Sequence, residues 1–355
     1  MNATMDMTKA EAFGERMLGA FNDAALILLT SLGQRTGLFD ALAELPPSTS
    51  ARIAETAGLH ERYVREWLGG MVVGGVVEYD PADRTYSLPA EHAAALTRAA
   101  GPNNVAAVAA YVPVLASVED EVARCFRHGG GVPYSSYPRF QEVMAEDTGA
   151  VADATLVDIT LPLVPDLVDR LREGIAVADV GCGSGHALNV MAQAFPSSRF
   201  VGYDLSEEAI ERARGEAKSL GLSNTTFEVK DLATWDERGR YDLITAFDVI
   251  HDQARPAAVL QAIAEALAPD GTFLMVDFAA SSALEDNVEH PLGPALYTFS
   301  VFHCTTVSLA QDGAGLGTVW GEQKAVEMLR DAGFSSVEVQ RLDPDPFNNY
   351  YIARR

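Results

Sequence analysis

The chain has 355 residues, 48% of them hydrophobic, and a formal net charge of −24 at pH 7. This length suits about two domains, and no apolar run approaches the roughly 18 residues that a membrane-spanning helix needs. The excess of acidic residues repels phosphate backbones and anionic lipid heads, so we expect no nucleic acid and no membrane among the partners.

The first residues and the cysteines bear on location. Residues 1–12 carry acids and lack the apolar segment of a secretory signal. The three cysteines, Cys125, Cys182 and Cys304, are odd in number and far apart, which argues against a disulfide framework. We therefore expect a cytoplasmic protein with free thiols.

A long helical segment is predicted over about residues 13–45. Apolar residues recur at helical spacing from Phe13 to Leu32, and Pro46 follows the segment. A small domain cannot bury an apolar stripe of this length alone. We therefore expect the stripe to pack against a second copy of the chain, which gives a homodimer.

The next residues show the pattern of a winged helix. Helices are predicted over 51–57 and 60–71, and two short strands over 72–79 and 84–88 form the wing. Winged helices often read DNA, but here the candidate recognition helix balances two arginines with two acids (Arg62, Arg65, Glu61 and Glu66). We expect a dimerisation module. A winged-helix transcriptional regulator that senses a metabolite without catalysis is the alternative.

Helices without a domain of their own follow. They are predicted over 105–127, 139–146 and 151–172, and a loop rich in glycine and tyrosine, 129–138, interrupts them. This stretch is predicted to connect two domains.

A glycine-rich turn organises the rest of the chain. The apolar strand 175–180 leads directly into Gly181, Gly183 and Gly185, and the helix 186–195 follows. Glycine permits positive φ and lets the backbone approach a ligand, while free N–H groups at the helix start attract a negative group. Strand, turn and helix in this order open a nucleotide-binding fold.

A second strand, 199–203, ends in Asp204, at the offset of about 20 residues expected for an acid that binds ribose hydroxyls. The glycine spacing is G-x-G-x-G, whereas nicotinamide dehydrogenases have G-x-G-x-x-G, so we set a dehydrogenase aside. Further strands are predicted over 227–232, 241–248, 271–277, 336–342 and 349–353, with a last helix over 322–332. About 40 residues, 279–321, intervene after the fifth strand, and we expect this insert to form a lid.

The glycine turn, the acids at the strand ends and the order of the five strands resemble the class I S-adenosylmethionine-dependent methyltransferases, over roughly residues 150–355. The resemblance implies an α/β fold with a Rossmann-like parallel sheet that ends in an antiparallel hairpin. It is preceded by an all-helical winged-helix dimerisation domain with its wing. The implied domains are 1–100, a connector that caps the pocket over 101–172, and a cofactor-binding domain over 173–355 with the lid at 279–321.

The resemblance implies S-adenosylmethionine as cofactor and methyl transfer to a small-molecule substrate. The implied cofactor-binding residues are Asp179, Gly181, Gly183, Gly185, Asp204, Leu205, Asp231, Leu232 and Asp248. For the acids the alternative is that they are solvated strand ends. The connector residues Tyr134, Tyr137 and Arg139 are candidates for the substrate pocket, with a loop packed on the surface as the alternative.

Catalytic residues are expected just beyond the fourth strand. His251 and Asp252 follow Asp248 and match the His-Asp pair of small-molecule O-methyltransferases with a winged-helix domain, in which the histidine is the base. The alternative is a histidine that is satisfied within a helix start.

A second histidine, His303, lies in the lid. Here the chain also resembles a narrower actinobacterial group that includes α-keto acid C-methyltransferases, in which two histidines hold a non-haem iron; His251 and His303 would be these ligands. The alternative is that His303 is a core residue of the lid. The acceptor atom stays open, since oxygen, carbon, nitrogen and sulfur acceptors all suit this scaffold.

Overall fold

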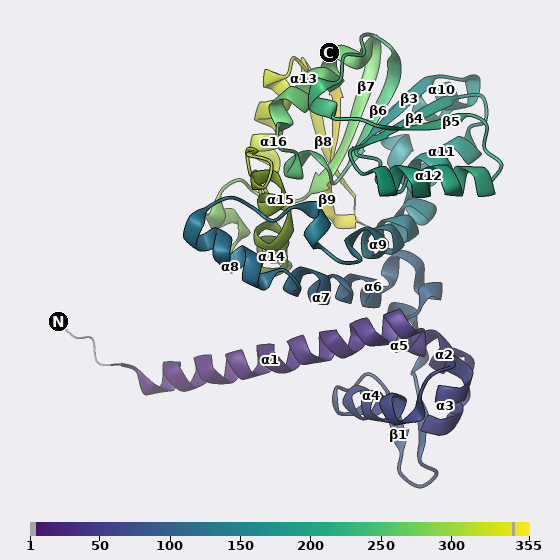
Figure 1. Cartoon of the computed structure of the whole chain (residues 1–355), viewed down its shortest axis with the longest axis vertical. Helices are drawn as coiled ribbons and strands as arrows, with labels where there is room; N and C mark the ends of the chain where they lie inside the picture. The colour runs from purple at the N-terminus through teal and green to yellow at the C-terminus, as the bar shows by residue number, and fades with distance from the viewer. Residues whose placement is uncertain (1–4, 343–344) are drawn as a thin grey trace. The chain divides into compact units, whose positions relative to one another are not determined.

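The structure is a computed structural model that describes residues 5–342 and 345–355. The chain divides into two compact units, Met1–Val114 and Leu115–Arg355, which Figure 1 shows with their helices and strands labelled.

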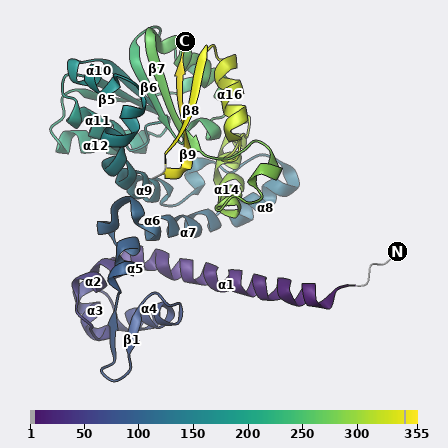
Figure 2. The same cartoon turned by 180° about the vertical axis from the view of Figure 1, so that it is seen from behind.

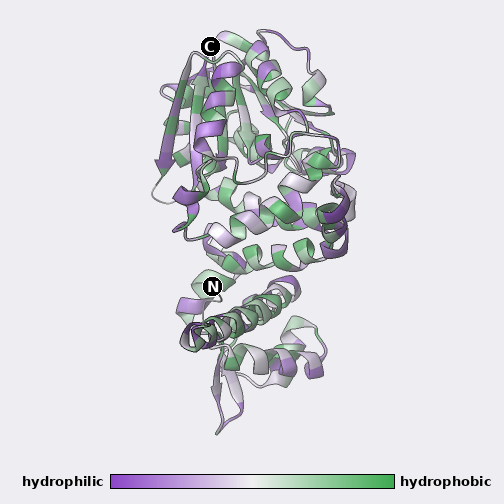
Figure 3. Ribbon diagram, turned by 90° about the vertical axis from the view of Figure 1, so that its left-hand side faces the viewer, coloured by the Kyte–Doolittle hydropathy of each residue, from purple (hydrophilic) through white to green (hydrophobic). Residues whose placement is uncertain are grey.

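The first unit begins with a single long helix, α1 (Met7–Thr36), followed by α2 (Leu38–Glu44). The carboxylate of Asp6 caps α1 by accepting the N–H groups of Thr8 and Lys9, and Gly37, with a φ of 70°, ends it in the left-handed conformation. Many hydrophobic residues of α1 are exposed, including Phe13 (60%) and Phe21 (69%), and Figure 3 shows hydrophobic residues along this helix. The predicted apolar stripe is thus present and uncovered within the chain.

A winged helix follows. It consists of α3 (Ser50–Ala57), α4 (Glu61–Val73), β1 (Glu78–Asp80) and β2 (Thr85–Ser87), and α5 (Ala90–Leu96) and α6 (Val105–Ala109) complete the unit up to α7 (Tyr111–Ala116). The first wing strand is shorter than predicted, because residues 72 and 73 complete α4, whose buried face includes Leu68 and Met71. The arginines of α4 pair with its acids, as the sequence indicated.

The second unit is built on a seven-stranded sheet with the order β5-β4-β3-β6-β7-β9-β8. Five strands are parallel, and β9 and β8 form the antiparallel hairpin, so the predicted Rossmann-like sheet is confirmed. The strands are β3 (Ala176–Val180), β4 (Arg199–Asp204), β5 (Thr225–Val229), β6 (Tyr241–Phe247), β7 (Leu267–Phe278), β8 (Ser336–Leu342) and β9 (Asp345–Arg354).

Helices cover both faces of this sheet. They are α10 (Leu167–Glu173), α11 (His186–Ala194), α12 (Glu207–Ser219), α13 (Pro256–Ala266) and α16 (Gly321–Asp331). One buried cluster joins α10, α11 and α12 to the sheet, and another joins α13 and α16 to it. Strand residues that alternate between the two clusters, such as Val177 and Ala178, explain why the central strands are apolar along their whole length.

Two strand predictions need correction. The third strand starts and ends earlier than expected, since Asp231 caps a short turn at 232–234 instead of ending the strand. The fifth strand was predicted to start at residue 271, but β7 starts at Leu267, and its pairing with β6 shifts register between Tyr241 and Leu243.

The connector contains more breaks than predicted. The expected helix 105–127 is divided into α6, α7 and α8 (Glu119–His128). Pro113, which has no N–H to bond to Ala109, accounts for the break between α6 and α7. Conversely, α9 (Phe140–Thr155) runs through the expected gap at 147–150, and the expected helix 151–172 breaks before α10, in a stretch with Pro162 and Pro165. The insert contains α14 (Gly293–Phe299) and α15 (Thr305–Leu309).

Candidate active site

The glycine turn follows β3 with three positive φ angles, 69° at Gly181, 52° at Gly183 and 74° at Gly185. A Cβ on Gly181 would lie 2.1 Å from the side chain of Val249, and one on Gly185 would lie 2.5 Å from the ring of Phe227. A Cβ on Gly183 would meet nothing within 4 Å. Packing therefore requires the outer two glycines, while Gly183 borders open space where a ligand can approach the backbone.

Asp204, at the end of β4, lies beside this turn. Its Oδ2 accepts the N–H of Gly183 at 2.9 Å, and its Oδ1 accepts the N–H of Ser206 at 2.8 Å. Burial raises the pKa of Asp204, although these backbone hydrogen bonds act in the opposite direction. The carboxylate is thus fixed next to the turn with lone pairs to spare, which fits a ribose diol. The next residue, Leu205, is 53% exposed.

Asp179 and Asp231 have partners within the protein. Asp179 is buried and accepts a hydrogen bond from the Thr245 hydroxyl at 2.7 Å, and burial raises its pKa to about 7. Asp231 accepts the N–H of Ala233 with one oxygen and contacts the Arg255 guanidinium with the other at 2.6 Å. Its neighbour Leu232 is buried in the core.

Asp248 stands out at the end of β6. It has a φ of 53°, which is uncommon for a residue other than glycine, and its buried Oδ1 has no hydrogen-bond partner among the described residues. Burial, followed by the charge of Asp277, raises its pKa to about 8. A buried acceptor without a partner, held in strained backbone, is the kind of group that a ligand satisfies.

His251 is paired with a carboxylate that the sequence prediction missed. Its Nδ1 lies 2.9 Å and 3.1 Å from the two carboxylate oxygens of Asp277, and both residues are buried. Burial by itself lowers the pKa of His251, but the charge of Asp277 and hydrogen bonds with Asp277 and Cys304 raise it well above its ordinary value.

The carboxylate that contacts His251 is therefore that of Asp277, and not that of the adjacent Asp252. Asp252 points elsewhere and accepts a hydrogen bond from the hydroxyl of Tyr134 at 3.3 Å. Burial raises the pKa of Asp252 to about 6, although His251 and the Tyr134 hydrogen bond oppose this shift. Adjacent residues of the short turn 250–252 point in different directions, and only His251 reaches the end of β7.

His303 lies in an aromatic box formed by Tyr134, Tyr137 and Phe140. Phe140 stacks on the imidazole with ring centroids 3.9 Å apart, and the two tyrosine rings meet it edge-on at 4.8 and 5.0 Å. Burial, and then the charge of His251, lowers the pKa of His303 to about 3, so the ring is neutral. Within the described part of the chain, its buried Nε2 has no hydrogen-bond partner.

The connector and the insert form one roof over the strand ends. The N–H of Val132 bonds to the carbonyl and hydroxyl oxygens of Thr306, and the Tyr137 hydroxyl donates to the carbonyl of Phe302 at 2.5 Å. Figures 1 and 2 show α8, α9 and α14 at the end of the sheet where the parallel strands finish. The structure thus brings Tyr134 and Tyr137 to the site.

Arg139 is different. Its guanidinium is engaged by Glu142, three residues along, at 3.0 and 3.2 Å, and it faces this carboxylate rather than the aromatic box. The interpretation of Arg139 as a free substrate-binding cation is therefore not favoured by the geometry.

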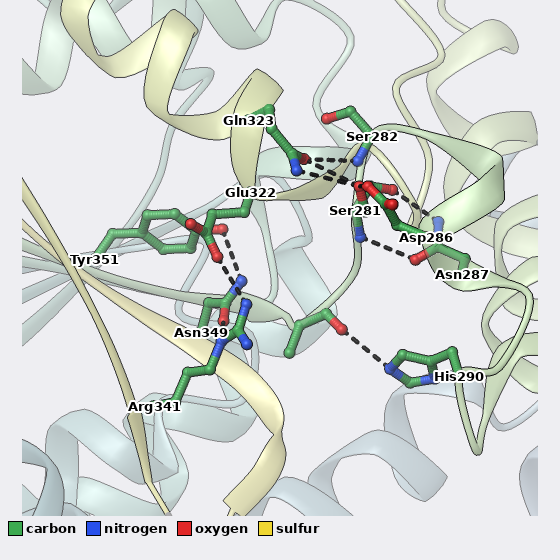
Figure 4. Close-up of polar contacts among 11 residues, drawn as sticks. Ser281, Ser282, Asp286, Asn287, His290, Glu322, Gln323, Arg341, Asn349 and Tyr351 are labelled. Atoms are coloured by element: carbon green, nitrogen blue, oxygen red, sulfur yellow. Dashed lines mark hydrogen bonds and ion pairs between the residues drawn. The ribbon is translucent and has the colours of Figure 1, made fainter.

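The root of the insert is fastened to α16 by a polar network that Figure 4 shows. Ser281 and Asn287 bond to one another through backbone and side-chain groups, the N–H of Ser282 donates to the Gln323 side chain at 2.8 Å, and His290 donates to the carbonyl of Ala279. The two ends of the insert are thereby held together, so any movement of the roof takes place beyond this network.

Comparisons with known proteins agree with this geometry. A family model described as a methyltransferase domain matches residues 171–333, and one described as an Rv2258c-like winged helix-turn-helix domain matches residues 24–98. Residues 171–333 are a methyltransferase domain. The resemblance to class I S-adenosylmethionine-dependent methyltransferases with an N-terminal winged helix is thus confirmed.

Curated relatives match part of the chain. (S)-Coclaurine N-methyltransferase of Papaver somniferum is 26% identical over 171 residues, which are 47% of this chain and 48% of the relative. A ubiquinone biosynthesis O-methyltransferase of Shewanella halifaxensis is 31% identical over 114 residues, 31% of this chain and 48% of the relative. The chain spans about half the length of the curated relatives that it matches.

Solved structures match the whole chain. A Nostoc punctiforme protein assigned as an O-methyltransferase gives a TM-score of 0.73 with 20% identity, covering 99% of this chain and 100% of that one. Mitomycin 7-O-methyltransferase gives 0.71 with 20% identity, 99% and 100% covered. Human N-acetylserotonin methyltransferase, solved with S-adenosylmethionine, gives 0.69 with 17% identity, 100% and 99% covered. At these identities the likeness establishes the fold.

Among residues 5–342 and 345–355, no group of three or more His, Cys, Asp and Glu side chains is arranged to hold a metal ion. Across the same residues, every helix is too short or too polar to cross a membrane.

The sequence pattern did not indicate two residues of the candidate site, Asp277 and Phe140. Asp277 is the only acid in the otherwise apolar run from Phe273 to Phe278, and a lone acid at a parallel strand end is a detectable pattern. Phe140 looks like any apolar helix residue, so no local pattern indicates that it stacks on His303.

Proposed function

We propose that the chain is an S-adenosylmethionine-dependent methyltransferase that acts on a small-molecule acceptor. This proposal is supported by the residues that gather at one edge of the sheet. The glycine turn lies at the end of β3 and Asp204 at the end of β4. Asp248 and His251 come after β6, and Asp277, the partner of His251, lies at the end of β7. The bound cofactor would supply an activated methyl group on a sulfonium.

Each residue has a task that follows from its surroundings. Asp204 would accept hydrogen bonds from two ribose hydroxyls, and the open space at Gly183 would let the ligand lie against the backbone. Asp179 is buried and has a raised pKa, and the buried Oδ1 of Asp248 has no hydrogen-bond partner among residues 5–342 and 345–355. Both carboxyl groups would favour a cationic group between the turn and β6. Leu205 and Leu232 would flank the adenosine, and Asp231 would contribute at this end.

His251 would be the general base. Asp277 accepts a hydrogen bond from the Nδ1–H group, and this fixes the tautomer in which Nε2 carries the lone pair that would take a proton from the acceptor. The charge of Asp277 then stabilises the imidazolium that results. Proton removal makes a weak nucleophile, such as a hydroxyl or an acidic C–H group, reactive towards the methyl carbon. Tyr134, Tyr137 and Phe140 would form the apolar wall around the acceptor.

The experiment for this proposal is turnover of a panel of small metabolites with methyl-labelled cofactor. Wild type is expected to transfer label to at least one acceptor, and His251→Ala is expected to lose this transfer while still binding cofactor. Full activity in His251→Ala would remove the base assignment.

A non-haem iron site is the second candidate, and one observation favours it. The buried Nε2 of His303 lacks a partner in the part of the chain that the structure describes, and Asp277 orients His251 as carboxylates orient metal-binding histidines. Imidazole is a type of ligand that binds iron, but two imidazoles do not complete its coordination, so further ligands would have to come from a substrate such as an α-keto acid. Iron would polarise the keto group and so acidify the neighbouring C–H. Chelation separates this candidate from the base.

We also infer a homodimer through α1. The exposed stripe on this helix includes Met17 (51%), Leu18 (64%) and Phe21 (69%), and a monomeric soluble protein rarely leaves such a stripe open to water. A cytoplasmic location is consistent with the free cysteines and the acidic composition.

A further inference from the structure

The helix α9 runs along the roof of the site and touches it at several points. Its first residue, Phe140, stacks on His303, and two turns later Asp147 adds to the raised pKa of Asp248, after burial and Asp277. Phe140, Val143 and Gly149 are its buried residues, so apolar packing holds the first half of the helix better than the second. In the second half, Ala152 packs against the core, and polar contacts add to this packing.

His186 provides a polar link to that second half. It is the first residue of α11, directly after Gly185 of the glycine turn. Its Nε2 lies 2.9 Å from a carboxylate oxygen of Asp153 on α9, and its Nδ1 lies 2.6 Å from one of Glu216 on α12. Asn189 donates to the other oxygen of Glu216 at 2.8 Å, and a Cβ on Gly149 would lie 3.5 Å from the His186 ring. The partly exposed imidazole of α11 thus contacts both α9 and α12.

We propose that His186 is a positioning residue which, when protonated, bridges Asp153 and Glu216 and so holds α9 over the site beside the glycine turn. The proposal rests on the proposed function, since α9 is a roof only if an acceptor lies beneath it. The side chain of His186 would thus link two parts of the site. Gly185 of the glycine turn, where the cofactor would bind, precedes His186, and Phe140, which would contact the acceptor, begins the helix that His186 holds.

The chemistry of imidazole makes this link depend on pH. Only the imidazolium donates from both nitrogens, whereas the neutral ring donates from one and leaves the other carboxylate without a donor. Asp153 from α9 and Glu216 from α12 are the charged groups that face the ring. Burial lowers the pKa of His186, but the hydrogen bonds and charges of these two carboxylates outweigh burial and raise it. The link is therefore complete below about pH 6.5, the ordinary value, and is lost as the pH rises through the raised pKa.

Hydrogen exchange of the full-length protein, without cofactor or acceptor, tests the link. We would follow peptides from α9 at pH 6 and pH 9 in wild type, His186→Gln and Asp153→Asn, correcting for intrinsic exchange rates. Asp153 is 65% exposed, so Asp153→Asn is expected to fold even if His186→Gln does not. The matched control is Arg212→Ala, which breaks an exposed ion pair with Glu208 on the same helix as Glu216.

At pH 6 we expect the second half of α9 to exchange roughly tenfold faster in both site variants than in wild type and in Arg212→Ala. Wild type should approach the variants at pH 9, and the variants should change little with pH. In turnover assays the variants should raise KM for the acceptor by more than they lower kcat. Unchanged α9 protection in Asp153→Asn, or equal wild-type protection at both pH values, would overturn the proposal. Because exchange is read without ligands, a protein that transfers no methyl group would contradict the proposed function and leave this test intact.

Discussion

Asp277 Oδ1 lies 2.9 Å from His251 Nδ1, with both side chains buried, although Asp252 is the acid next to His251 in the sequence. The two partners come from the ends of neighbouring parallel strands, since Asp277 belongs to β7 and His251 follows β6. The carboxylate therefore orients the histidine through tertiary structure, and this relationship generates the first two predictions.

Asp277→Asn is expected to lower kcat by about 100-fold or more, because the amide neither fixes the tautomer by charge nor stabilises the imidazolium, and general-base catalysis contributes roughly 10²–10⁴. Asp252→Asn is the matched control and should lose less than about tenfold, since Asp252 contacts Tyr134 instead. Steady-state kinetics with saturating cofactor decide this. A greater loss of kcat in Asp252→Asn than in Asp277→Asn would indicate that Asp252, and not Asp277, supports His251 in catalysis.

The pH dependence follows from the raised pKa of His251. A base must be neutral to accept a proton, and the buried Asp277 keeps His251 protonated above its ordinary pKa of about 6.5. The rate is therefore expected to rise with pH, with a midpoint above 6.5, and the midpoint should move to lower pH in Asp277→Asn, which removes the negative charge. Cofactor affinity is measured over the same range as a control. A wild-type midpoint below 6.5 would be the opposite of this expectation.

A substitution of His303 distinguishes the general-base role of His251 from an iron site. With His251 as a base, purified protein contains no stoichiometric iron, activity survives chelation, and His303→Ala keeps kcat within about tenfold. The matched control is His290→Ala, a histidine of the same insert that bonds to the backbone of Ala279. Stoichiometric iron, loss of activity on chelation and recovery with added iron would contradict the general-base role of His251 and support the non-haem iron site.

The exposed stripe of α1 predicts the oligomeric state. One chain has a mass of 38.0 kDa, and wild type should show twice this mass in light scattering. A double variant with Phe13→Ser and Phe21→Ser should approach the mass of one chain. Phe126→Ser is the matched control, because Phe126 is also exposed (78%) but lies on α8 in the second unit. A wild type with the mass of one chain would contradict the inferred dimer.

Local patterns predicted most of the fold. The alternation of apolar strands and helices from 175 onward fixed the order of elements, and the glycine turn with Asp204 at its side was found by spacing alone. Helix ends were less accurate where proline decided them, as at Pro113, Pro162 and Pro165.

The parts of the site that the sequence missed depend on contacts between distant segments. Asp277 and His251 lie at the ends of neighbouring strands, and Phe140 and His303 are more than 160 residues apart in the sequence. Hydrophobic periodicity describes only neighbouring residues, so it cannot predict either contact. The contact of Arg139 with Glu142 is local, and its spacing of three residues could have been noticed in the sequence.

Cofactor binding is measured by isothermal titration calorimetry with S-adenosylmethionine and with its demethylated product. We expect heat of binding for both ligands in wild type and at least tenfold weaker binding in Asp204→Ala, because each hydrogen bond to a charged group contributes about 1.5–3 kcal/mol. Asp236→Ala, which changes an acid that is 91% exposed, should bind as wild type does. Wild type that gives no heat with either ligand, or an Asp204→Ala variant that binds both with unchanged affinity, would contradict the account.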